Sequence, residues 1–204
     1  MGSVGVSNIS NIEKPVVAGS YNATQEMKDF AMSVAQDMQK DFPMLAKSFD
    51  ILYEKYMGSV AGYGFLNKIE LNGAYLKKSF AQKDLDYVRG VIAHELTHTM
   101  QDRIATAEGI KGSEARDAYI DNMWNKAVDR YVADHPGITP KEINRRVSAI
   151  YGGGGHSRQG GSGKERMAVA VEHFYNKIPQ GVDRHMNIAG EVGKYVIEEL
   201  KRRK

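Results

Sequence analysis

The segment His94-Glu95-Leu96-Thr97-His98 is the feature that most restricts how this chain can fold. It lies within a pattern, Val91-Ile92-Ala93 before it and Thr99-Met100 after it, that is typical of a buried helix. Two histidines four residues apart lie one turn apart on the same helix face, so both imidazoles can reach one metal ion. Glu95 projects beside that face, within reach of a metal-bound water as a general base. The pattern therefore predicts a buried helix that carries two metal ligands and a carboxylate.

Composition limits the remaining ligands and the class of protein. The chain has 204 residues and no cysteine, so any metal has to be held by His, Asp or Glu, and a disulfide scaffold is excluded. Its 28 Lys and Arg against 25 Asp and Glu give a net charge of +3, too small to favour nucleic acid as a partner. No run approaches the roughly 20 apolar residues of a membrane span, and Met1 to Ile12 lacks the features of a signal peptide. We expect a protein that is cytoplasmic or exported without a signal peptide.

Helical periodicity recurs along most of the chain. Residues 1–22 mix Gly, Ser, Asn and Val without any period, and we expect a flexible N-terminal arm followed by a single domain over 23–204. Apolar spacing, with caps such as Thr24 and Thr139, predicts a series of helices. They are expected over 25–40, 84–105, 113–134, 140–151, 164–177 and 185–203.

The β-forming residues are confined to one region. Between Ser48 and Lys78 they are broken by glycines, which predicts two to four short strands in a twisted antiparallel sheet. The part 23–106 then holds a helix, the sheet and the motif helix, and the part 107–204 is helical around a Gly-rich loop at 152–163. This segregation predicts an α+β fold, with a small twisted sheet packed on the motif helix and a mostly helical C-terminal half.

A catalytic zinc site has three protein ligands and one open position, so a third ligand is expected downstream of His98. Glu165 opens a predicted helix, and the small Ala168 one turn later lets that helix approach the motif helix closely. Spacing and helix chemistry alone place Glu165 only slightly ahead of Glu172. Whichever is the ligand, the two lie roughly 10.5 Å apart along the helix, so only one can reach the metal. The full set of candidates is Glu108, Glu114, Asp117, His156, Glu165, Glu172 and His173.

The motif resembles the active-site helix of the zincin metallopeptidases, and the chain is most similar among them to the anthrax lethal factor and Mlc titration factor A peptidases. Those peptidases have HExxH followed closely by Asp, then a Tyr-Gly pair, then an E-x-x-A(V) helix that ends in Glu and aromatics. This chain has Asp102, Tyr151-Gly152 and a helix that runs from Glu165-Arg166-Met167-Ala168-Val169 to Glu172-His173-Phe174-Tyr175. The resemblance spans roughly residues 45 to 200, with identity confined to these short motifs.

The resemblance implies a zinc-dependent endopeptidase of the gluzincin type, with one Zn²⁺ per chain and a peptide or protein as substrate. It makes Glu165 the third ligand beside His94 and His98, and Tyr151 the tyrosine that assists catalysis. Glu95 then takes a proton from the zinc-bound water as that water attacks the scissile carbonyl. Glu172 is expected to accept a hydrogen bond from a ligating histidine or from the backbone.

Further expectations concern the surroundings of the site, the basic end of the sequence and a second class of function. Asp102 shares the face of the histidines and is expected either to orient one of them or to be an ordinary surface acid. The substrate backbone is expected to add to a strand edge at 73–77. The basic end Lys201-Arg202-Arg203-Lys204 is expected to be a frayed, solvated terminus. A second class of function stays open: a latent or inactive binding or structural protein on a zincin scaffold, inhibited by its own arm at 1–22.

Overall fold

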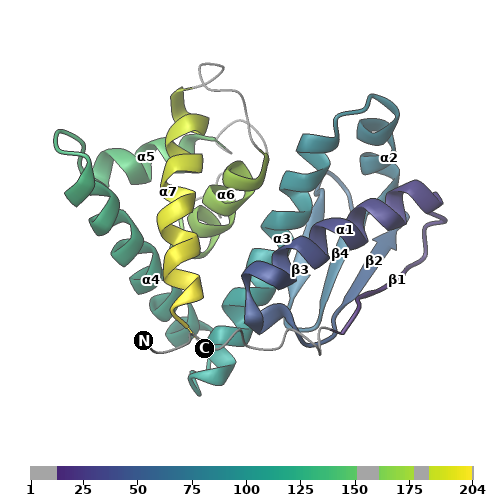
Figure 1. Cartoon of the computed structure of the whole chain (residues 1–204), viewed down its shortest axis with the longest axis horizontal. Helices are drawn as coiled ribbons and strands as arrows, with labels where there is room; N and C mark the ends of the chain where they lie inside the picture. Colours follow the sequence, from purple (N-terminus) through teal and green to yellow (C-terminus); the bar gives the residue numbers. More distant parts are fainter. Residues whose placement is uncertain (1–12, 151–160, 177–183, 204) are drawn as a thin grey trace, which may run out of the picture.

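The fold is α+β. A computed structural model describes residues 13–150, 161–176 and 184–203 of the chain. The strands are β1 (Val16–Ala18), β2 (Asp50–Glu54), β3 (Gly62–Phe65) and β4 (Lys68–Asn72). The α-helices are α1 (Gln25–Asp41), α2 (Gly73–Ala81), α3 (Leu85–Ala107), α4 (Ser113–Asp134), α5 (Pro140–Ala149), α6 (Gly163–Asn176) and α7 (Arg184–Lys201). Figure 1 shows the sheet with α1, α2 and α3 on one side of the molecule and α4 to α7 on the other.

The four-stranded sheet is mixed, with the order β1-β2-β4-β3. β1 pairs parallel with β2, β2 pairs parallel with β4, and β3 pairs antiparallel with β4. The prediction of an antiparallel sheet was therefore wrong. α1 provides the long connection that a parallel β1–β2 pair requires, and β3 returns by a tight turn onto β4. As a result β3 is an edge strand at the opposite border of the sheet from β1.

The ordered fold begins earlier than predicted. Strand β1 lies within residues 1–22, which were expected to form a flexible arm, and its register pairs Val17 with Ile51. The backbone N–H of Tyr21 also donates to the carbonyl of Tyr53 at 2.9 Å. A strand of three residues gives almost no periodic signal of its own, because its stability comes from the partner strand that it pairs with.

Helix α2 occupies the segment in which a strand edge at 73–77 was expected, so that prediction was wrong. The side chain of Asn72 caps this helix by accepting a hydrogen bond from the N–H of Tyr75 at 3.2 Å. The amide of Asn72 also donates to the carbonyl of Val60 at 2.9 Å, which fixes the helix start against the preceding loop. Gly73 is required at the first position because a Cβ there would lie 2.2 Å from the ring of Tyr21.

The other helices begin and end within about two residues of their predicted bounds. Local capping explains this agreement. Thr24 accepts a hydrogen bond from the N–H of Met27 at 3.2 Å, and Thr139 accepts one from the N–H of Glu142 at 3.2 Å. The Glu142 carboxylate in the same first turn binds Arg145 and Arg146. Along the described residues, no helix combines the length and apolar character needed to cross a bilayer.

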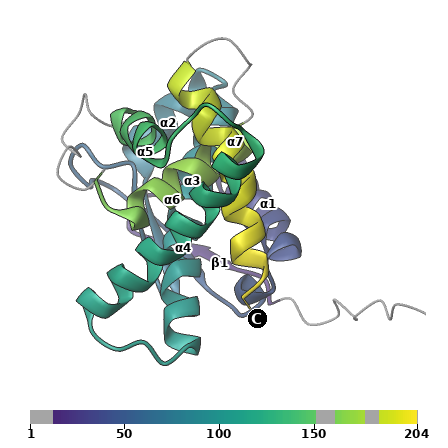
Figure 2. The same cartoon turned by 90° about the vertical axis from the view of Figure 1, so that its left-hand side faces the viewer.

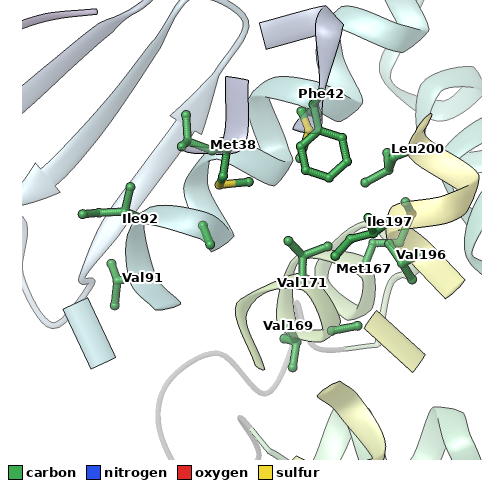
Figure 3. Packing of buried hydrophobic residues seen from close by; sticks show 14 of the residues in the cluster. Met38, Phe42, Val91, Ile92, Met167, Val169, Val171, Val196, Ile197 and Leu200 are labelled. Atoms are coloured by element: carbon green, nitrogen blue, oxygen red, sulfur yellow. The ribbon is translucent and has the colours of Figure 1, made fainter. Parts of the chain in front are cut away.

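Helix α3 lies at the centre of the molecule, between the sheet and the C-terminal helices. It contacts β3, β4 and α1 on one side and α6 on the other. Ile92 faces Met38 of α1, while Val171 and Met167 of α6 pack toward α7 (Figure 3). Figure 2 shows α6 and α7 near each other within the helical half, where the two helices are in contact. Because α3 is buried on several faces, some of its polar residues are buried as well: Glu95, Thr97, His98, Thr99 and Gln101. Two of them, His98 and Gln101, contact α6.

Candidate metal centre

Helix α3 brings the two motif histidines together on its α6-facing side. Thr97 and Leu96 between them are buried, so the helix cannot rotate to expose this face without losing packing. The Nε2 atoms of His94 and His98 lie 3.2 Å apart, and their ring centroids lie 4.9 Å apart. Two imidazole nitrogens therefore point at one location between α3 and α6.

Glu165, in the first turn of α6, completes a three-residue group with these histidines. Its carboxylate oxygens lie 3.6 Å from His94 Nε2 and 3.5 Å from His98 Nε2. Among the described residues, these three side chains form a group whose ligand atoms lie close enough together to hold one metal ion. Zn²⁺ in tetrahedral geometry, with bonds of about 2.0–2.1 Å, separates its donor atoms by about 3.3–3.4 Å. The three side chains therefore fit a zinc ion without a change of backbone.

The opposite nitrogen of each imidazole is held by a buried acceptor. His94 Nδ1 lies 3.0 Å from Glu172 Oε2, and His98 Nδ1 lies 2.9 Å from Gln101 Oε1. The Gln101 amide donates through Nε2 to the carbonyl of Lys164 at 2.9 Å, which fixes its oxygen toward His98. Both Nδ1 atoms therefore have an acceptor for a proton, which leaves Nε2 of each neutral imidazole as the nitrogen available to a metal.

The position of Glu165 is set by the start of α6. The N–H of Glu165 is bound by Ser162 Oγ at 3.3 Å, and the N–H of Gly163 is bound by Asp121 of α4 at 2.5 Å. A Cβ on Gly163 would lie 2.2 Å from that carboxylate, so only glycine permits this close approach. Contacts to α3 through Gln101 and to α4 through Asp121 together place the third carboxylate opposite the histidines.

The charges in the group favour a cation. Burial lowers the pKa of His94, but the carboxylates of Glu165 and Glu172 raise it by more, so that it lies well above its ordinary value. Burial raises the pKa of Glu165, but hydrogen bonding to His94 and His98 lowers it by more, so that it lies below its ordinary range. Both directions have the same cause, which is that two nearby carboxylates stabilise positive charge at the imidazoles.

Glu95 is buried between α3 and strand β3. Burial raises the pKa of its carboxyl, and the neighbouring His94 and His98 offset part of that rise. A Cβ on Gly62 would lie 2.7 Å from Glu95 Cγ, and a Cβ on Gly64 would lie 2.2 Å from the Glu95 carbonyl oxygen. The two glycines of β3 therefore let the edge strand run directly against the residue that was predicted to be the general base.

No family model matches this chain, and neither does any curated protein or solved structure. The resemblance to the lethal factor and Mlc titration factor A peptidases therefore stays a prediction. A function for this chain therefore has to be argued from the donor atoms of the candidate site: their distances, their burial and their hydrogen-bond partners.

The structure separates the predicted site residues into three groups. His94, His98 and Glu165 are brought together, and Glu172 accepts from a histidine, as expected for the glutamate that is not a ligand. Tyr151 and His156 lie outside the described residues. The remaining candidates are not part of the group: Glu108, Glu114, Asp117 and His173.

The partner of His98 was missed from the sequence. Asp102 was considered for this role, but its side chain points to Arg116, 4.0 Å away, and lines a cavity that also borders Arg116 and Asp117. Gln101, three residues after His98, takes the position instead. The signal was available, because residues three apart also share a helix face.

Proposed function

We propose that this protein is a zinc-dependent endopeptidase with a zincin-type active site. The observation that carries the proposal is the convergence of His94 Nε2, His98 Nε2 and the Glu165 carboxylate, at 3.2, 3.6 and 3.5 Å from one another. Two imidazoles and a carboxylate are a donor set that suits zinc, and three protein ligands leave a fourth position for water or substrate.

Each side chain of the group has a separate task. Bound zinc supplies Lewis acidity, which polarises a carbonyl oxygen and makes a water acidic near neutral pH. Glu95, beside both histidines, accepts the proton of the attacking water and delivers it to the leaving amine nitrogen. Glu172 and Gln101 keep the imidazoles oriented through Nδ1. Tyr151, as a second donor to the oxyanion, remains a prediction.

The free edge of β3 is the candidate site for the substrate backbone, in place of residues 73–77. The N–H of Asn72 donates to the carbonyl of Ala61, so Ala61 and Asn72 form a hydrogen-bonded pair of the β3–β4 ladder. Hydrogen-bonded and non-bonded pairs alternate in an antiparallel ladder, which leaves the N–H and C=O groups of Gly62 and Gly64 pointing away from β4. An extended peptide can bind these groups as an added strand beside Glu95.

The alternative function, a latent protein inhibited by its own arm, draws no support from the described part of that arm. Strand β1 lies at the far border of the sheet from β3, so residues 13–22 leave the β3 edge unobstructed. A peptidase whose edge strand β3 is left unpaired by residues 13–22 is therefore the function that we propose.

The test combines metal analysis with turnover. Purified protein should contain one zinc per chain and cleave an unfolded protein substrate such as casein. Chelation should abolish cleavage, and added zinc should restore it. Glu95→Gln should keep the zinc and lose cleavage, because it removes only the proton acceptor. Cleavage that persists in Glu95→Gln, or a purified protein with no affinity for zinc, would refute the proposal.

A further inference from the structure

Strand β3 carries two aromatic side chains that are largely exposed. Tyr63 is 46% exposed and Phe65 is 40% exposed, and their rings lie 6.4 Å apart. Side chains alternate along a strand, and the other two residues of β3, Gly62 and Gly64, face α3. The two aromatic rings therefore share the outer face of the sheet, at the same edge that borders Glu95.

The charges next to these rings neutralise each other. The cross-strand partners of Tyr63 and Phe65 are Glu70 and Lys68 of β4. Lys68 Nζ lies 2.6 Å from Glu70 Oε1 and 5.0 Å from the centroid of the Phe65 ring. Because Lys68 and Glu70 pair with each other, the outer surface of β3 that a neighbouring strand would contact is aromatic and carries no net charge.

A strand added to β3 would meet this surface in a fixed register. Its residues opposite Gly62 and Gly64 would hydrogen-bond to the free backbone groups and point their side chains toward α3. Its residues opposite Tyr63 and Phe65 would place their side chains on the outer face, beside the rings. In the added peptide, the two residues opposite Tyr63 and Phe65 are separated by one residue. The β3 edge would therefore distinguish peptides by the side chains at every second position.

We propose that Tyr63 and Phe65 select the substrate: an extended segment with large apolar or aromatic side chains at two positions, two residues apart. The inference rests on the proposed peptidase function and adds the substrate class to it. Such segments are β-prone stretches of unfolded or partly unfolded proteins, in which both positions are accessible. The residue between them faces α3 and the metal ligands.

The first experiment measures binding, without any requirement for turnover. Zinc-loaded Glu95→Gln protein is titrated into fluorescent ten-residue peptides of equal composition, whose two aromatic residues are either two positions apart or adjacent. Cross-strand aromatic pairs contribute about 0.2–1 kcal/mol each, so two pairs should give a preference of roughly 2- to 30-fold for the spaced peptide. Equal affinity for the two peptides would overturn the proposal.

The second experiment assigns the preference to the two side chains. The double variant Tyr63→Ser/Phe65→Ser should lose most of the preference for the spaced peptide. It should keep its zinc content, because both side chains are exposed and neither belongs to the proposed metal site. Tyr56→Ser is the matched control, since Tyr56 is an exposed tyrosine outside β3, and it should bind like the parent. A double variant that retains the preference would overturn the proposal.

The two proposals fail in different ways. If the protein holds zinc and cleaves casein but shows no preference for the spaced peptide, the substrate class is wrong and the peptidase function stands. If it neither holds zinc nor cleaves, but the metal-free protein prefers the spaced peptide through Tyr63 and Phe65, the function is wrong and β3 is a peptide-binding edge. Absence of both activities refutes both proposals.

Discussion

Gln101 is a buried amide, 1% exposed, whose two ends join the two helices that carry the ligands. Its oxygen accepts from His98 of α3, and its nitrogen donates to the carbonyl of Lys164, the residue before Glu165. One side chain therefore orients one proposed metal ligand and fixes the backbone next to another. Partners of this kind contribute to metal affinity although they never touch the metal.

We expect Gln101→Leu to weaken zinc binding by about 10- to 100-fold, because His98 loses the acceptor that holds its tautomer. The dissociation constant is measured by competition with a chromophoric chelator. Gln39→Leu is the matched control, since Gln39 is also a buried amide, and it donates to the carbonyls of Glu13 and Leu45 far from the site. Gln39→Leu should lower stability and leave zinc affinity unchanged; an equal loss of affinity in both variants would contradict the role of Gln101.

The two glutamates of α6 should differ sharply when each is truncated. Glu165→Ala removes a donor atom and should empty the site at moderate chelator concentration. Glu172→Ala removes only the partner of His94 Nδ1, so zinc should bind, with affinity reduced by about 10- to 100-fold. Zinc content is measured by elemental analysis after dialysis against the chelator. An empty Glu172→Ala site together with a full Glu165→Ala site would reverse the two assignments.

Much of the site could be predicted at the residue scale. The spacing of His94 and His98 determines that their rings lie on one helix face, whatever the rest of the fold does. Glu165 and Glu172 could only be separated by the packing of α6 on α3, since both lie on the same side of their helix. The spacing of Gln101 from His98 was visible in the sequence, but its bond to the carbonyl of Lys164, 63 positions away, depends on the packing of α6 on α3.

At the scale of elements, β3 is the strand whose sequence is most tightly constrained by the helix beneath it. Gly64→Ala would place a Cβ 2.2 Å from the Glu95 carbonyl and 2.7 Å from His98 Cβ. Neither of these atoms can move without moving α3. We expect a loss of about 1–3 kcal/mol in the free energy of unfolding, measured with a chemical denaturant, together with weaker zinc binding.

The control for this glycine is Gly161→Ala, because no atom lies within 4 Å of a Cβ at Gly161 and its backbone has no positive φ. That variant should match the parent in both stability and zinc affinity. If Gly64→Ala is as stable as Gly161→Ala, strand β3 has room to shift away from α3, and the close contact between them is not required.

Elements were predictable where their signals are local. Thr24 and Thr139 mark helix starts by bonding to their own first turns, and the sequence shows both. Strand order was not predictable, because β1 pairs with β2 across the intervening helix α1, and the parallel register joins residues that lie far apart in the sequence. Helix α2 was misread as a strand because Tyr75 and Leu76 are β-formers, although Asn72 is a valid cap.

At the scale of the whole molecule, the candidate metal site lies between the two parts of the fold. His94 and His98 belong to α3, which packs on the sheet, whereas Glu165 belongs to α6, which packs on α4 and α7 (Figure 1). An ion held by all three residues links these layers directly. Zinc binding should therefore stabilise the entire fold rather than only the two helices.

The size of that stabilisation follows from linkage. With free zinc at a thousand times its dissociation constant, the folded state gains about 4 kcal/mol. For a chain of this length each kcal/mol raises Tm by about 2–4 °C, so zinc should raise Tm by roughly 8–16 °C, measured by calorimetry with and without the metal. Glu95→Gln should show the full rise, because it keeps all three ligands, and Glu165→Ala should lose most of it. A rise of the same size in Glu165→Ala would mean that the stabilising ion binds elsewhere in the chain, and the link between α3 and α6 would have to be abandoned.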